Sequence, residues 1–158
     1  SIFVLVLIFL TPILILLSAK SALASGNVEG WAWSENIGWI SLNSTNCDAD
    51  GDGFSDGIVP GCPPAGTPIP DYGVNLDLSN GKLSGYAWSE NIGWIKFDPV
   101  GPYPDSPNYS ACINLPDVPG EVCEADLSEN EVGGWIRALA YSDGWDGWIE
   151  LRGTTEDG

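Results

Sequence analysis

The sequence predicts an all-β protein made of tandem antiparallel β-meander repeats about 55 residues apart, with an Asp-rich loop inserted in the first repeat. Residues 30–40 (GWAWSENIGWI) return as residues 85–95 (GYAWSENIGWI), and similarity at a fixed spacing indicates an array of supersecondary units. Residues 72–78 (YGVNLDL) alternate between apolar and polar, as a half-buried strand does. No window after residue 24 shows the periodicity of an amphipathic helix.

The N-terminus predicts export. Residues 1–17 are almost wholly apolar, and residues 22–24 (ALA) have the small-x-small form of a signal-peptidase site. We therefore expect residues 1–24 to be a signal peptide and the protein to be secreted or held at the cell surface. The alternative is a retained transmembrane helix, but this stretch is at the lower length limit for a span and Pro12 interrupts it. Because the chain lacks an initial Met and breaks off just after a strand-like run, we expect a fragment of a longer reading frame.

Two repeats follow the signal, over residues 25–71 and 72–111. In each, an aromatic-Ala-Trp segment places aromatic rings on one face of a strand and alanine on the other. A short SENI connection leads to Gly-Trp-Ile in the next strand, and its Asn and the following Gly can adopt the positive φ of a hairpin turn. The Asn80-Gly81 pair between alternating runs extends the second repeat to a three-stranded meander over residues 72–97.

A third, degenerate repeat is expected over residues 112–158, truncated at the C-terminus. Residues 147–151 (GWIEL) keep nearly the same spacing from the second copy, with another Gly-Trp just upstream. Residues 128–130 (SEN) followed by residues 134–136 (GWI) offer a second alignment. The register of this repeat stays open between the two.

The tryptophans are expected to form the core between the meanders, because identical placement in successive units favours packing over ligand binding. Trp33 and Trp88 should then lie in matching environments, and so should Trp39 and Trp94. Exposed rings would instead form a sugar-stacking platform, so the burial of these side chains distinguishes a structural module from a carbohydrate-binding module.

Residues 48–56 (DADGDGFSD) carry the most specific chemical pattern in the chain. This spacing predicts a calcium site. Its ligands would be the carboxylates of Asp48, Asp50, Asp52 and Asp56 and the backbone carbonyl of Phe54. Four carboxylates this close, with no Lys or Arg among them, repel one another unless a cation is bound. The alternative is a solvated acidic loop.

The Asp-rich loop resembles the calcium-binding loops of thrombospondin type 3 repeats and dockerins, with their D-x-D-x-D-G-x-x-D pattern. It departs from an EF-hand at position twelve, where Val59 replaces the bidentate Glu, so water or a remote carboxylate such as Asp71 would complete the site. The chain as a whole resembles uncharacterised secreted bacterial proteins with W-S-x-N-I-G-W-I repeats. That resemblance implies export and no established activity.

Four cysteines, Cys47, Cys62, Cys112 and Cys123, follow the signal, and they allow three pairings. Pairing Cys47 with Cys62 and Cys112 with Cys123 is favoured because each pair brackets an insert rich in Pro and Gly. Zinc is a poor alternative because neither a C-x-x-C spacing nor a histidine is present.

Composition restricts the function. The net charge of −17 argues against nucleic acid or an anionic membrane as partners, and the lack of histidine excludes serine-protease triads. Glu35 and Glu90 occupy equivalent repeat positions, whereas a glycosidase acid and nucleophile need different environments. We predict a non-enzymatic, calcium-stabilised surface or adhesion module whose partner is a cell-surface polymer or a protein. The alternative is a carbohydrate-binding module that uses exposed Trp and Tyr side chains. A third hypothesis, that the chain is part of a larger secreted hydrolase, is the least favoured.

Overall fold

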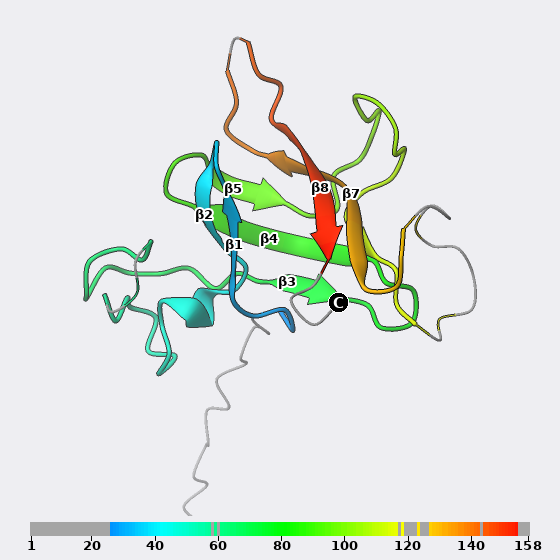
Figure 1. The fold of residues 1–158 in the computed structure, drawn as a ribbon. Helices are drawn as coiled ribbons and strands as arrows, with labels where there is room; N and C mark the ends of the chain where they lie inside the picture. The colour runs from blue at the N-terminus through cyan, green and yellow to red at the C-terminus, as the bar shows by residue number, and fades with distance from the viewer. Residues whose placement is uncertain are drawn as a thin grey trace, which may run out of the picture.

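The computed structural model is an all-β molecule with antiparallel strands in a curled sheet and almost no helix (Figure 1). It describes residues 26–57, 59, 61–116, 118, 123, 127–142 and 144–154. The predicted signal peptide and the last four residues of the third repeat lie outside these described residues. The elements are β1 Trp31–Ser34, β2 Gly38–Ser41, the 3-10 helix η1 Ser44–Asn46, β3 Val74–Leu76, β4 Leu83–Ser89, β5 Gly93–Lys96, β6 Cys112–Ile113, β7 Glu131–Ala138 and β8 Trp148–Thr154.

The sheet runs in the order β1-β2-β4-β5-β7-β6, with β3 also beside β4 and β8 also beside β7. Strand β4 changes partner along its length, because residues 83–85 pair with β3 and residues 86–89 pair with β5. Gly85 permits this change: its φ is +94°, and a Cβ there would lie 2.3 Å from the Gly73 carbonyl oxygen. The meander predicted over residues 72–97 is therefore present as β3, β4 and β5, which lie side by side (Figure 1).

The β1–β2 and β4–β5 hairpins have the same register, with Trp33 opposite Trp39 and Trp88 opposite Trp94. The glycine that opens the second strand of each hairpin takes a positive φ, as predicted, whereas the asparagine two residues earlier does not. The Asn91 side chain instead donates a hydrogen bond of 2.7 Å to a carbonyl in the turn of the other hairpin. The two turns are thereby tied together.

In the third hairpin, β7–β8, an arginine takes the place of one Trp of the facing pair. Arg137 lies opposite Trp148, at the position where the other hairpins set two indoles against each other. Gly134 and Gly147, which directly precede the Trp residue of each strand, have φ values of 93° and 84°. The connection between these strands is longer than in the first two hairpins.

The core is mainly aliphatic, so the prediction that the tryptophans form it is wrong for most of them. Its buried members are Ile40, Val74, Leu83, Ala87, Ile95, Phe97, Ala111 and Ile136. Trp33 and Trp39 are 59% and 47% exposed, and only Trp135 among the eight indoles is buried. Because Ala87 alternates with Trp88 along β4, burying the alanine face turns the indoles to the opposite face. The corresponding alanine of the first hairpin, Ala32, is exposed, so this alternation buries an alanine in β4 and not in β1.

Both disulfides expected from local pairing are formed. Cys47 is bonded to Cys62 and Cys112 to Cys123, with Cα–Cα separations of 5.5 and 5.9 Å. In the Cys47–Cys62 loop, the described residues form no strand or helix. Within the described residues, no helix combines the length and the apolar character that crossing a membrane would require.

Candidate functional site

The Asp-rich loop brings three of its carboxylates together. One oxygen from each of Asp48, Asp50 and Asp52 lies within 4.8 Å of the others. Asp48 is only 5% exposed, and its carboxylate accepts the backbone N–H groups of Asp52 and Gly53 at 3.0 and 2.9 Å. The Asp50 carboxylate accepts the same Asp52 N–H at 3.1 Å. Positive φ values at Gly51 and Gly53 let the backbone curl around this cluster.

The other two predicted ligands have different positions. The Asp56 carboxylate accepts the Ala49 N–H at 2.8 Å, and the Asp56 N–H donates to the Cys47 carbonyl at 2.8 Å. Asp56 therefore closes the neck of the loop and is not part of the three-carboxylate cluster. Phe54 has an exposed ring, and its N–H donates to the Asp52 carboxylate at 2.8 Å.

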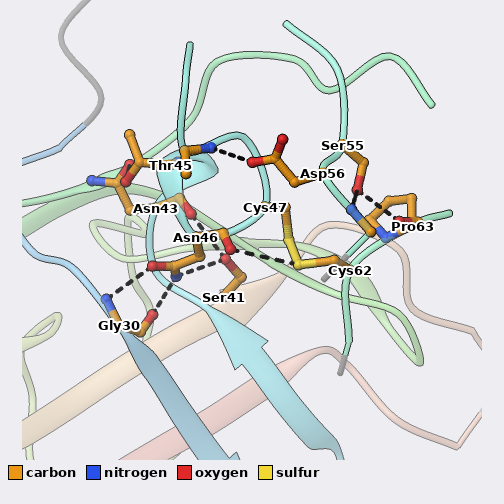
Figure 2. The surroundings of a disulfide bond; sticks show 12 residues. Gly30, Ser41, Asn43, Thr45, Asn46, Cys47, Ser55, Asp56, Cys62 and Pro63 are labelled. Atoms are coloured by element: carbon orange, nitrogen blue, oxygen red, sulfur yellow. Dashed lines mark hydrogen bonds between the residues drawn. A yellow bond between two sulfur atoms is a disulfide. The ribbon is translucent and has the colours of Figure 1, made fainter. Parts of the chain in front are cut away.

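The base of the loop is closed by a disulfide and tied to neighbouring backbone by two asparagine side chains (Figure 2). The Cys47–Cys62 bridge joins its two ends. The Asn46 side chain donates to the Gly30 carbonyl at 2.6 Å and accepts the Gly30 N–H at 3.2 Å, which ties η1 to the start of β1. Asn43, fully buried, donates to the carbonyl of Gly26 at 2.6 Å. The acidic cluster thus lies on a rigid support.

The donor set of the loop fits a hard cation. Carboxylate oxygens suit calcium, which takes about six to eight oxygen ligands at roughly 2.3–2.6 Å, and neither imidazole nor free thiolate is present to favour a softer metal. Three carboxylates are an incomplete set, so a bound calcium ion would need further oxygen ligands such as water. Asp71, considered as a remote ligand, lines a hollow beside Tyr72 and does not belong to the cluster.

The face of the sheet opposite the core is covered by paired aromatic rings. Trp33 and Trp39 meet edge to face with ring centroids 4.9 Å apart, and Trp88 and Trp94 repeat this separation. The second pair is half-buried, because Tyr72 packs edge-on against Trp94 at 5.3 Å and the proline-rich end of the Asp-rich insert lies beside it. The prediction that the two Trp pairs have matching environments is therefore confirmed for the separation of their rings and wrong for their solvent exposure.

Two hollows on the aromatic face share Pro70, Tyr72 and Trp94 as lining residues. The first, about 280 Å³, is completed by Cys47, Pro63, Thr67, Pro68, Ile69 and Trp88. The second, about 320 Å³, is completed by Asp71, Tyr86 and Leu139. The Tyr72 hydroxyl donates to the Ser41 hydroxyl at 2.7 Å, and burial raises the pKa of Tyr72 above its usual value. Its phenol therefore stays neutral at physiological pH, and the hollows are walled by rings with few polar atoms.

Arg137 is a functional candidate that was not predicted from the sequence. Its guanidinium carbon lies 4.6 Å from the Tyr141 ring centroid and 4.8 Å from that of Trp148, and Lys96 is its partner on β5. Strand alternation already places Arg137 on the same face as Trp135. The proximity of Arg137 to Lys96 could not be predicted, because it depends on the pairing of β5 with β7 and the register of the third repeat was open.

Comparison with known proteins gives no match: no family model, curated protein or solved structure matches the chain.

Proposed function

We propose that this chain is an exported, non-catalytic, calcium-stabilised β-repeat protein that acts as a structural or adhesion module at the cell surface or outside the cell. The observation that carries this proposal is the aromatic face, where Trp33 and Trp39 expose large rings on a sheet packed on its other side, and it supports the adhesion role over a purely structural one. Exposed apolar patches mark interaction surfaces. Export is supported by the two disulfides, since such bonds persist in oxidising compartments.

Backbone conformation supports the repeat architecture. Gly30, Gly85 and Gly134 each directly precede the first aromatic residue of a hairpin, and their φ values are 94°, 94° and 93°. The glycine before the Trp of the second strand also has a positive φ in all three hairpins. The same pair of special backbone positions therefore recurs, as expected for copies of one unit in which only glycine tolerates the required φ.

Calcium is proposed as the ion of the Asp-rich loop. The three-carboxylate cluster concentrates negative charge in a chain that already carries a net charge of −17. Asp48 is the strongest support, because a buried carboxylate is costly without a partner of opposite charge, and its present partners are two neutral N–H groups. A bound cation would offset the repulsion among the three groups.

Substitution of Asp50 tests the calcium proposal. We expect isothermal titration of the full chain to give one calcium site, and Asp50→Asn to weaken binding about tenfold or more by removing one charged ligand. Asp77→Asn is the matched control, because Asp77 is also exposed and also accepts a backbone N–H two residues ahead, outside the cluster. This site would be ruled out if no binding were seen at millimolar calcium at several temperatures. It would also be ruled out if both variants lost calcium affinity equally.

Carbohydrate binding is the second candidate function, and the exposure of Trp33 and Trp39 favours it over a purely structural role. An indole face offers a flat apolar surface against which the C–H face of a sugar ring can pack, while its N–H remains able to hydrogen-bond. Rings that a rigid strand already orients lose little conformational entropy on binding.

Co-sedimentation tests the aromatic face as a binding surface. The full chain should sediment with isolated bacterial cell envelopes or with insoluble polysaccharide, and the Trp33→Ala, Trp39→Ala double variant should lose about tenfold or more in affinity. Leu78→Ala is the control, because Leu78 is an exposed apolar side chain in the turn between β3 and β4, away from the indoles. If both variants sediment like the unaltered chain, the aromatic face is not the binding surface.

A further inference from the structure

Four strands align one row of side chains on the aromatic face. Tyr86 on β4 lies opposite Lys96 on β5, Lys96 lies opposite Arg137 on β7, and Arg137 lies opposite Trp148 on β8. Directly opposed residues project to the same face and are near neighbours. We call Tyr86, Lys96, Arg137 and Trp148 the cationic row; with strands about 4.8 Å apart, it spans about 14 Å. The two central residues of the row are cationic, and the residue at each end is aromatic.

The direct opposition of the two central cations carries a cost in stability. Like charges directly opposite each other on a sheet are destabilising. The chain has 22 acidic residues against 5 basic ones, yet among the described residues neither Lys96 nor Arg137 has a carboxylate within salt-bridge distance. The ion pair found there joins Arg152 to Glu150. As far as the described residues go, these two adjacent cations are therefore available to an external anion.

Arg137 is held in a fixed orientation. Its guanidinium is covered by the Tyr141 and Trp148 rings at 4.6 and 4.8 Å, and its Nε donates to the Asp146 carbonyl at 3.2 Å. Within the described residues, the terminal guanidinium nitrogens have no such partner. These nitrogens match a carboxylate in a bidentate geometry, and an arginine that is already oriented loses less entropy on binding.

The surface beside the cationic row suits a sugar rather than a bare anion. The hollow of about 320 Å³ is walled by Tyr86 from the row and by Trp94, whose position two residues before Lys96 puts it on the same face. These rings can pack against the C–H faces of sugar rings, and the Asp71 carboxylate in the same hollow can accept a hydrogen bond from a hydroxyl group.

We propose that the cationic row binds a uronic-acid-bearing glycan, with the carboxylate of the sugar between Lys96 and Arg137 and its ring faces against the neighbouring aromatic side chains. This assignment rests on the proposed carbohydrate-binding function and specifies its ligand class through charge complementarity. The net charge of −17 repels densely charged polymers, so the row favours glycans whose carboxylates are spaced by neutral sugars.

Matched ligands test the charge requirement. The probes are tetrasaccharides in which glucuronate, galacturonate or mannuronate alternates with a neutral sugar, each compared with its carboxyl-reduced form. We expect at least one acidic probe to bind the full chain about tenfold or more tightly than its reduced form. Lys96→Gln and Arg137→Gln should each abolish that preference, so that the ratio of the two affinities falls to about one. Arg152→Gln is the matched control, because this exposed cation is already ion-paired.

Near-ultraviolet circular dichroism verifies the fold of each variant, and Lys96→Arg, which keeps the charge, should retain the preference. Equal binding of acidic and reduced probes would overturn the uronate assignment and leave carbohydrate binding intact. An acidic peptide of the same charge that binds as tightly as the best glycan would also overturn it. If no sugar binds, the uronate assignment and the carbohydrate function both fail.

Discussion

At the scale of single residues, strand alternation sets Ala87 and Trp88 on opposite faces of the sheet. Ala87 is fully buried, while Trp88 beside it reaches the opposite face. The prediction that the indoles form the core relied on their identical placement in successive repeats, and an exposed aromatic face repeats in the same way. A curled sheet has limited room on its inner side, so small and branched aliphatic side chains fill it and the large rings lie outside.

Two adjacent residues on β2 test this division. Ile40→Ala should lower the free energy of unfolding by about 2–5 kcal/mol, because Ile40 is buried in the core. Trp39→Ala should lower it by less than half as much, although it deletes more atoms, because that indole is 47% exposed. Urea unfolding followed by circular dichroism measures both. A larger loss in Trp39→Ala would show that the aromatic face contributes more stability than the core.

At the scale of elements, the loop of the first repeat joins an acidic cluster to a disulfide. The Asp56 N–H donates to the carbonyl of Cys47, so the neck of the loop and the bridge share one backbone contact. The bridge restricts the loop ends and reduces the entropy lost when an ion orders the carboxylates. Ion binding and an intact Cys47–Cys62 bridge should therefore stabilise each other.

Reduction kinetics test that coupling. Calcium should slow the reduction of Cys47–Cys62 by dithiothreitol about fivefold or more relative to chelator, because the bound loop opens less often. The Cys112–Cys123 bridge is the internal control, since it lies outside the acidic loop and should be reduced at the same rate in both conditions. Alkylation at timed intervals followed by peptide mass spectrometry follows both bonds in one sample. Equal effects of calcium on the two bridges would contradict the coupling.

At the scale of the whole molecule, local sequence patterns predict the strands and turns better than they predict which strands pair over long distances. The meander, the turn glycines and the disulfide pairing follow from short segments, because alternation and turn chemistry act over a few residues. The pairing of β5 with β7 joins Ile95 to Ala138 and Lys96 to Arg137 across a long connection. No local pattern encodes that register, and both the cationic row and the hollows beside it depend on the long-range arrangement.

Net charge gives a prediction for the entire chain. With a net charge of −17, the folded state concentrates carboxylates that repel one another, and salt screens this repulsion. Raising NaCl from about 20 mM to about 300 mM without calcium should therefore stabilise the fold by roughly 1 kcal/mol, or about 2–4 °C in melting temperature. Differential scanning calorimetry measures the shift. A lower melting temperature in salt would indicate that local ion pairs outweigh the overall repulsion.

The near identity of residues 30–40 and 85–95 also bears on how the chain folds. Two such similar segments offer each strand a wrong partner of almost equal quality, which is a familiar source of kinetic traps. Here each segment pairs with itself across a three-residue connection, and the facing Trp residues lie within one hairpin. Short hairpins close in about 1–10 μs, and nearby segments meet sooner than distant ones. The correct partner is therefore found before the similar but distant one can compete.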